Sequence, residues 1–356
     1  MTYDPDALIR VAHVGMHPDR LRKLVRKTGT PTRVLRRIES GELSVPASAR
    51  EAAAVPADER REQLRQAGIE FLVPGDSSFP GRLAELDDAP LFLFQKGGRF
   101  EGTAVAIVGT RACTTYGRRL AERYGEAVSR AGWWVASGLA KGIDGAAHAG
   151  SLRGPTPGIA VLGSGVDVWY PRLHRDLGMS LLEAGGVVWS EAPPGARPLG
   201  WRFPPRNRII SGIAQAVVVV EAGAKGGALV TSRLALEQGR DIFATPGDVG
   251  RPSSVGCNLL IRDGAFPVLD AEDLVESLEL AIGPAPGATP SEASAAVADP
   301  GLPVADFLAT LGDDPVLGMA ELGRLMAQGA VTIDGDGMVV TAPGGVRGPG
   351  PAGPAG

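Results

Sequence analysis

Arg202, Arg206 and Arg208 stand close together in the chain, with Phe203 and Asn207 between them. No acidic residue lies between Glu191 and Glu221, so this segment is locally cationic. A guanidinium group presents a planar fork that fits phosphate and also stacks on bases. The pattern therefore indicates a site for a polyanion, with nucleic acid as the expected ligand. An alternative stays open, in which the arginines begin a helix and form internal salt bridges.

Glycine-rich turns follow several apolar segments and supply a second set of candidate anion ligands. Glycine permits close approach of a ligand to the backbone, and the helix N-termini that follow direct N–H groups at anions. We predict anion loops at Gly109, Thr110, Gly138, Gly163, Ser164, Gly226 and Gly227. Arg111, Lys141 and Lys225 would add positive charge at the same edge, and Thr231 follows in the last of these loops.

Two common nucleotide motifs are missing from these loops. The chain has no Walker A sequence, which argues against ATP hydrolysis. Gly163-Ser164-Gly165 lacks the third glycine of the dinucleotide fingerprint, which argues against NAD. Asp144 and His148 are four residues apart, but no further metal ligand accompanies them, so a helix-capping Asp and a structural His are favoured. We expect no cofactor, no metal and no catalytic residue.

Aromatic residues interleave with the cations, as in proteins that hold single strands by stacking and phosphate contacts. Tyr170 precedes Arg172 and Arg175, and Tyr116 follows the first glycine turn. A packed turn with exposed charges is the alternative for residues 167–175.

Short apolar runs alternating with helical stretches predict an α/β fold with a doubly wound, mostly parallel sheet. The expected strands are Ala104–Val108, Trp134–Ser137, Ile159–Leu162, Val187–Ser190, Val217–Glu221, Asp241–Ala244 and Pro267–Leu269. The carboxyl ends of such strands line the ligand crevice, which would bring the glycine loops together. Apolar residues at helical spacing predict a small helical module before them, whose basic run over residues 20–27 is expected to be a solvated face.

The predicted organisation is an N-terminal helical module at 1–75, the sheet domain at 76–280, a linker at 281–303, a small unit at 304–342 and a disordered tail at 343–356. The linker and the tail are rich in Ala, Gly and Pro, which is typical of disordered segments. Val331–Ile333 and Met338–Val340 flank Asp334-Gly335-Asp336-Gly337 and predict a hairpin.

The composition limits the function further. The 356-residue chain has a net charge of −4, so nucleic acid would have to bind in a local groove rather than to a basic protein as a whole. Two distant cysteines imply no disulfide framework. The acidic N-terminus does not resemble a signal peptide, and no apolar run is long enough to span a bilayer. We expect a soluble, cytoplasmic protein without a membrane partner.

Several motifs in order resemble the DNA-processing protein A (DprA/Smf) family. They are Ala106–Arg111, Ser137–Asp144 with His148, Tyr170-Pro171, Ser190-Glu191, Phe203-Pro204 with Arg206–Ile210, Val220–Ala222 and Thr245–Gly247. The resemblance implies an extended Rossmann-like domain that binds single-stranded DNA. It also implies a homodimer that loads the RecA recombinase during natural transformation.

The family's DNA-contacting residues fall on Arg111, Arg175 and Phe203, whereas Gly200 stands where the family has a basic residue and Arg202 is the nearby substitute. The N-terminal helices resemble a sterile-alpha-motif-like module. The C-terminal unit resembles a reduced winged helix that is too short for three helices and a wing.

An enzymatic alternative is a nucleotide-binding hydrolase of the lysine-decarboxylase-like phosphoribohydrolase type. Residues 226–231, Gly-Gly-Ala-Leu-Val-Thr, match its glycine loop in part, but the expected catalytic Glu is missing. Non-enzymatic binding is therefore the favoured hypothesis.

Overall fold

The computed structural model describes residues 3–286, 302–310, 319, 322–323, 325–326, 331–334 and 337–341. The chain separates into two compact units, Met1–Ser277 and Leu278–Gly356. Among the helices in the described ranges, none is both long and apolar enough to cross a membrane.

The first unit is built on a sheet with the strand order β1-β2-β6-β5-β4-β3-β7-β8-β9. The strands β6-β5-β4-β3-β7-β8-β9 are parallel to one another. β2 and β1 are antiparallel additions at one edge. The bounds are β1 Ile69–Leu72, β2 Leu93–Gly97, β3 Ala104–Val108, β4 Trp134–Ser137, β5 Gly158–Val161, β6 Val187–Ser190, β7 Ala216–Val219, β8 Asp241–Ala244 and β9 Phe266–Pro267. The predicted mostly parallel, doubly wound sheet is confirmed.

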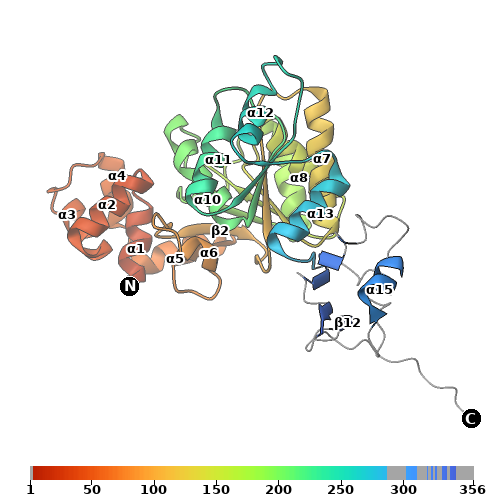
Figure 1. Cartoon of the computed structure of the whole chain (residues 1–356). Helices are drawn as coiled ribbons and strands as arrows, with labels where there is room; N and C mark the ends of the chain where they lie inside the picture. The colour runs from red at the N-terminus through yellow and green to blue at the C-terminus, as the bar shows by residue number, and fades with distance from the viewer. Residues whose placement is uncertain are drawn as a thin grey trace, which may run out of the picture. The chain divides into compact units, whose positions relative to one another are not determined.

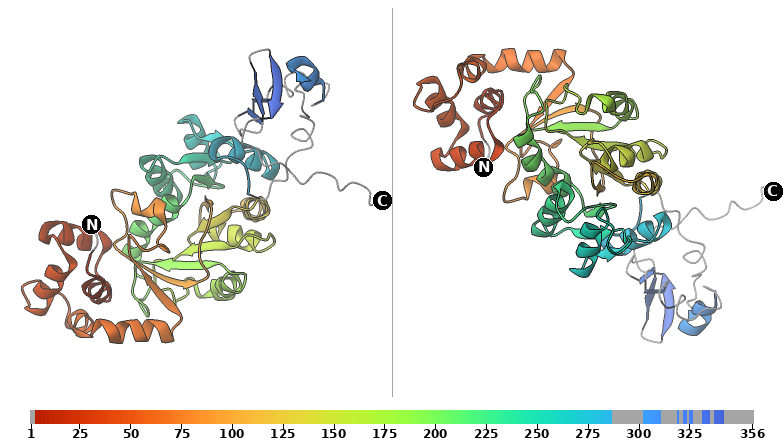
Figure 2. Two further views of the ribbon diagram at one scale, coloured as in Figure 1. Left: turned by 90° about the horizontal axis from the view of Figure 1, so that it is seen from below. Right: turned by 90° about the horizontal axis from the view of Figure 1, so that it is seen from above.

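Helices cover both faces of the sheet (Figure 1, and from two further sides in Figure 2). α7 (Thr115–Arg130) packs against α8 (Ile143–Ser151) on one face, and α10 (Phe203–Ile213) packs against α11 (Gly227–Glu237) on the other. The remaining helices of this part are α6 Gly81–Ala84, α9 Arg175–Glu183, α12 Val255–Arg262 and α13 Ala271–Ile282.

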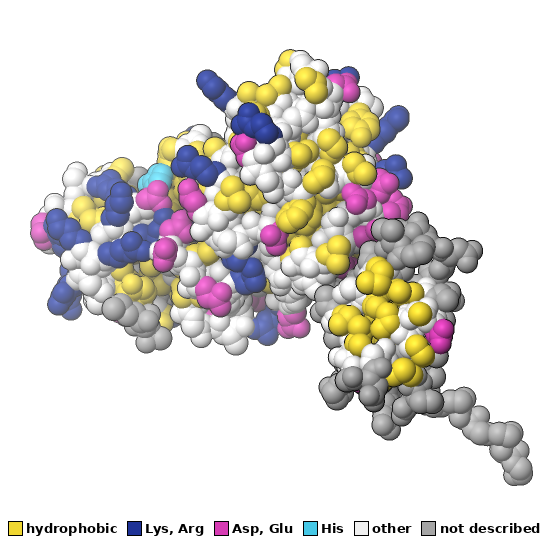
Figure 3. Space-filling model, in the orientation of Figure 1, with side chains coloured by type: hydrophobic (Ala, Val, Ile, Leu, Met, Phe, Trp, Pro, Cys, Tyr) yellow, Lys and Arg dark blue, Asp and Glu magenta, His cyan; other side chains and the backbone are white. Residues whose placement is uncertain are grey.

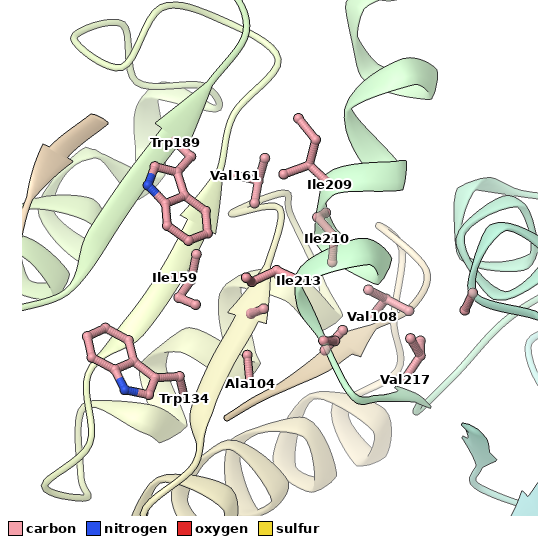
Figure 4. Close-up of a cluster of buried hydrophobic side chains, with 14 of the residues drawn as sticks. Ala104, Val108, Trp134, Ile159, Val161, Trp189, Ile209, Ile210, Ile213 and Val217 are labelled. Carbon is pink, nitrogen blue, oxygen red and sulfur yellow. The ribbon is translucent and has the colours of Figure 1, made fainter. Parts of the chain in front are cut away.

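α10 is fixed to the sheet by its apolar face. Ile209, Ile210 and Ile213 are spaced three and four residues apart, so they lie on one side of the helix. All three are at most 1% exposed and pack with Val108, Val161, Trp189 and Val217 of the strands (Figure 4). β3 and β7 are buried on both faces, so their sequences are continuous apolar runs, as is typical of strands covered by helices on both sides.

Five helices precede the sheet: α1 Pro5–Ala12, α2 Pro18–Thr28, α3 Pro31–Glu39, α4 Ala47–Ala54 and α5 Ala57–Gln66. Proline stands at the start of the first three, where its missing N–H costs nothing, and Asp4 and Thr30 cap α1 and α3. Their apolar faces share one core with Phe94, Ala160 and Val188 of the sheet. β1 lies inside the predicted 1–75 module, yet it is the edge strand of the sheet.

The second unit contains a three-stranded sheet in the order β10-β12-β11. β11 (Val331–Ile333) and β12 (Met338–Thr341) pair antiparallel, which confirms the predicted hairpin, and β10 (Leu302–Pro303) is followed by α15 (Val304–Thr310). Both ends of the predicted 281–303 linker are thus in regular structure, in α13 and β10. The rest of that linker and the predicted 343–356 tail lie outside the described residues.

Candidate nucleic-acid interface

A groove of about 600 Å³ opens at the carboxyl ends of β3 and β7. From β3 the parallel sheet proceeds through β4 in one direction, and from β7 it proceeds through β8 in the other. This reversal is the topological switch point, where open α/β sheets bind their ligands. Ten predicted site residues line the groove: Gly109, Thr110, Arg111, Phe203, Arg206, Asn207, Lys225, Gly226, Gly227 and Thr231.

Phe203 lines this groove together with Arg111 and Tyr170. The Arg111 guanidinium carbon lies 5.3 Å from its ring centroid, and the Tyr170 ring lies 5.5 Å away at an angle of 47°. A side chain at Gly163 would meet the Phe203 ring at 3.0 Å, so glycine there makes room for the ring. The cluster offers two π faces and an exposed cation side by side, which suits a base together with its phosphate.

The N-terminus of α11 forms the opposite wall. Gly226 caps the helix with a φ of +153°, and Lys225 is exposed beside it. The first N–H groups of a helix have no partners within the helix and favour an anion. Thr231 is buried, and its hydroxyl donates to the carbonyl of Gly227 at 3.0 Å, so it stabilises the turn.

Arg206 points inward rather than toward solvent. It is 6% exposed, and its guanidinium donates to the carbonyls of Gly138 and Val161, at the ends of β4 and β5. Burial lowers its pKa to about 10, and the Asp144 carboxylate opposes that effect. A side chain at Gly138 would meet the guanidinium at 2.5 Å, so this glycine is needed for packing.

The position of Arg208 differs from the prediction that its guanidinium binds a polyanion, because the residue is buried in the core. Its side chain is 3% exposed and contacts Glu191 at 2.6 Å and Asp88 at 3.5 Å. The salt-bridge alternative therefore describes Arg208. Asn207, between the two buried arginines, accepts from Arg206 Nε at 3.2 Å and lines the groove with the rest of its amide.

Other predicted residues lie at the edges of this region. Lys141 and Arg175 are exposed outside the groove lining, and neither forms an ion pair within the described residues. Ser164 is buried and donates to the carbonyl of Val168 at 2.6 Å, which explains it as a turn-forming residue. Gly200 lines the groove with open space around it. Tyr116 is 60% exposed but lines a different hollow.

The N-terminal helices support the groove wall from behind, which the sequence did not indicate. Trp201 stacks on His17 with centroids 5.3 Å apart, and Arg202 lies over the same indole at 4.9 Å. The hollow between these segments holds only about 20 Å³, room for no more than about one water. Trp201 therefore packs against protein partners in this smaller hollow although it is 40% exposed, whereas Phe203 lines the groove.

Lys and Arg side chains also gather over the N-terminal helices (Figure 3). Arg20, Lys23, Arg26 and Lys27 are exposed as predicted, whereas Arg22 is turned inward and pairs with Asp19 and, at 3.9 Å, with Asp88. Asp88, whose side chain is 42% exposed, also contacts Arg208, so a chain of ion pairs connects α2 to α10.

The sequence family described as DNA recombination-mediator protein A matches residues 70–279. The chain belongs to this family. It is 42% identical to Protein Smf of Escherichia coli over 247 residues, which are 68% of this chain and 66% of that protein. It is 39% identical to the DNA processing protein DprA of Bacillus subtilis over 217 residues, 60% of this chain and 73% of that one. The match to Smf thus spans just under two thirds of that protein.

Solved structures agree with this membership. The DNA processing protein A of Streptococcus pneumoniae superposes with a TM-score of 0.64 at 31% identity, over 78% of this chain and 98% of that one. DNA processing protein A of Helicobacter pylori, described with a single-stranded DNA binding mode, shares the fold with a TM-score of 0.52 at 24% identity, over 59% and 95% of the two chains. The family match over residues 70–279 covers the sheet domain that carries the groove.

Proposed function

We propose that the chain binds single-stranded DNA in the groove at the β3–β7 switch point, without strong sequence preference, and loads the RecA recombinase onto it. The observation that carries the proposal is the cluster of Phe203, Arg111 and Tyr170 facing the N-terminus of α11. Stacking and phosphate contacts do not read base edges, so the sequence of the strand should matter little. Membership of a recombination-mediator family and the H. pylori relative's description support the same function.

The test is a fluorescence-anisotropy titration with labelled oligothymidylate and with a duplex of equal length. If about three to five phosphates are neutralised, log K should fall against log salt with a slope of about −2 to −3.5. Arg111→Ala should weaken binding, because a hydrogen bond to a charged group contributes about 1.5–3 kcal/mol. An affinity that does not depend on salt, or equal affinity for duplex, would refute the proposal.

The wider role is proposed on the same basis: a homodimer that acts in the cytoplasm during DNA uptake and recombination. We expect sedimentation to give twice the monomer mass. We also expect added protein to speed RecA assembly on strands already coated with single-strand-binding protein. RecA assembly at an unchanged rate would contradict the mediator role while leaving DNA binding intact.

We further propose that the groove is a binding site and not a catalytic one. Among the described residues that line it, Asp144 is the one carboxylate. Its carboxylate accepts from the Gly138 N–H at 3.1 Å and faces Arg206, so it is held in a structural role. This arrangement favours binding over the phosphoribohydrolase alternative, and release of base from nucleoside monophosphates would contradict it.

A further inference from the structure

A second hollow of about 380 Å³ lies beside the groove, on the other side of the first turn of α11. Its lining includes Lys225, Gly226, Leu229, Val230, Arg233 and Leu234. The first four of these also line the groove described above. The two hollows therefore adjoin each other at the N-terminal turn of this helix, which lies between them.

Helical spacing explains how α11 serves both hollows. Gly227 and Thr231 are four residues apart and face the first groove, whereas Gly226, Val230 and Arg233 form the neighbouring stripe. The stripes converge at the N-terminal turn. A ligand chain that leaves the first groove at Lys225 would pass over this turn to enter the second.

Gly227 has no explanation in the fold itself. A side chain added there would meet only the Asn207 amide nitrogen at 4.0 Å, which is ordinary contact, and its backbone is helical. Gly226 also has open space, but its φ of +153° favours glycine. Gly227 is the first residue of α11, where alanine would fit the helical backbone at least as well as glycine. A ligand crossing close to the backbone would account for a residue without a side chain at Gly227.

We propose that the single strand crosses the first turn of α11 over Gly226 and Gly227, and that further nucleotides of the same strand bind in the second hollow. Their phosphates lie at Lys225 and Arg233, and their bases rest on Leu229, Val230 and Leu234. The inference rests on the proposed function. Arg233 is available for this contact because its side chain is 81% exposed and its ion pair with exposed Glu237, at 3.3 Å, is of the weak surface type.

The test compares Arg233→Ala with the wild type on oligothymidylates that increase in length from about 4 to about 16 nucleotides. We expect equal affinities for the shortest strands and a growing loss for the longer ones. On long strands the slope of log K against log salt should become shallower by about 0.7, the contribution of one phosphate of a single strand. Arg262→Ala is the matched control, because Arg262 is 70% exposed, pairs with Asp263 and lines neither hollow.

A second variant tests the crossing itself. Gly227→Ala should keep or raise the melting temperature and yet weaken binding of long strands, two effects that simple damage to the fold would not combine. Wild-type affinity of Arg233→Ala at every length, an equal loss in Arg262→Ala, or undiminished long-strand binding by Gly227→Ala would overturn the inference while leaving the proposed function intact. Wild-type binding by Arg111→Ala at every length would instead refute the proposed function, and the inference with it.

Discussion

Replacing Arg208 by alanine should destabilise the protein rather than selectively remove DNA binding. The guanidinium is almost fully buried and lies 2.6 Å from Glu191, whose side chain is 10% exposed. Removing one partner of a buried ion pair leaves the other charge unpaired in a medium of low dielectric, at a cost of about 3–5 kcal/mol. The lower end of this range applies, because Nε and Nη1 of Arg208 have no hydrogen-bond partner in the wild type.

A loss of about 3 kcal/mol lowers the melting temperature of a domain of this size by roughly 6–12 °C. Circular dichroism on the full chain measures that shift, and anisotropy well below both melting temperatures measures single-strand affinity. Arg111→Ala is the contrasting variant, since Arg111 is exposed and should change affinity without changing the melting temperature. The pair of substitutions Arg208→Met and Glu191→Met should recover part of the lost stability, because it leaves no unpaired charge.

Either of two results would refute this reasoning. If Arg208→Ala melts like the wild type but loses affinity as Arg111→Ala does, then Arg208 contacts DNA and its pairing with Glu191 is not structural. If the double Met variant is no more stable than Arg208→Ala, the unpaired charge is not the source of the loss.

Two further predictions concern the contact behind the groove wall and the buried histidines. His17→Ala and Trp201→Ala should each weaken single-strand binding by a few-fold at an unchanged salt slope, because they loosen the wall that carries Phe203; a changed slope would mean that they contact phosphate directly. Acidification should destabilise the fold, because burial lowers the pKa of His148 to about 3 and that of His13 to about 4. Both values lie below 6.5, the ordinary pKa of histidine, so the unfolded chain takes up protons at a higher pH than the folded chain. The stability that the two neutral histidines contribute is therefore full above pH 6.5 and is lost as the pH falls toward these values. Urea unfolding at pH 7 and pH 5 measures this loss of stability, which should be smaller in His148→Met. An equal loss in His148→Met would contradict the assignment of the pH dependence to His148.

The sequence predicted the sheet well because its signal is local. The apolar runs at Ala104–Val108, Trp134–Ser137, Val187–Ser190 and Asp241–Ala244 coincide with β3, β4, β6 and β8. β1 and β2 were not predicted, because they precede the alternation of strands and helices that indicated the parallel sheet and join it as antiparallel strands at its edge. The approach of the glycine loops to one another follows from parallel topology, which is why most of the predicted loop residues line one groove.

The orientation of the arginines could not be predicted from residue type. The apolar spacing did contain a signal for Arg206, which precedes Ile209, Ile210 and Ile213 by three, four and seven residues and so shares their buried face. The two partners of Arg208 could not be found in this way, because Asp88 and Glu191 come from distant parts of the sequence and meet Arg208 only in the folded chain. Contacts of this kind depend on tertiary structure alone.

The run Arg206-Asn207-Arg208 therefore divides its charge between two tasks. The two arginines hold α10 against the ends of β4, β5 and β6. The exposed cations that are free for phosphate come from other loops, at Arg111, Lys141, Arg175 and Lys225. Counting arginines in this segment would overestimate the phosphates that it neutralises. The salt dependence of binding should reflect only the exposed cations, whereas the buried pair contributes by keeping Phe203 in the groove lining, where a base can stack on it.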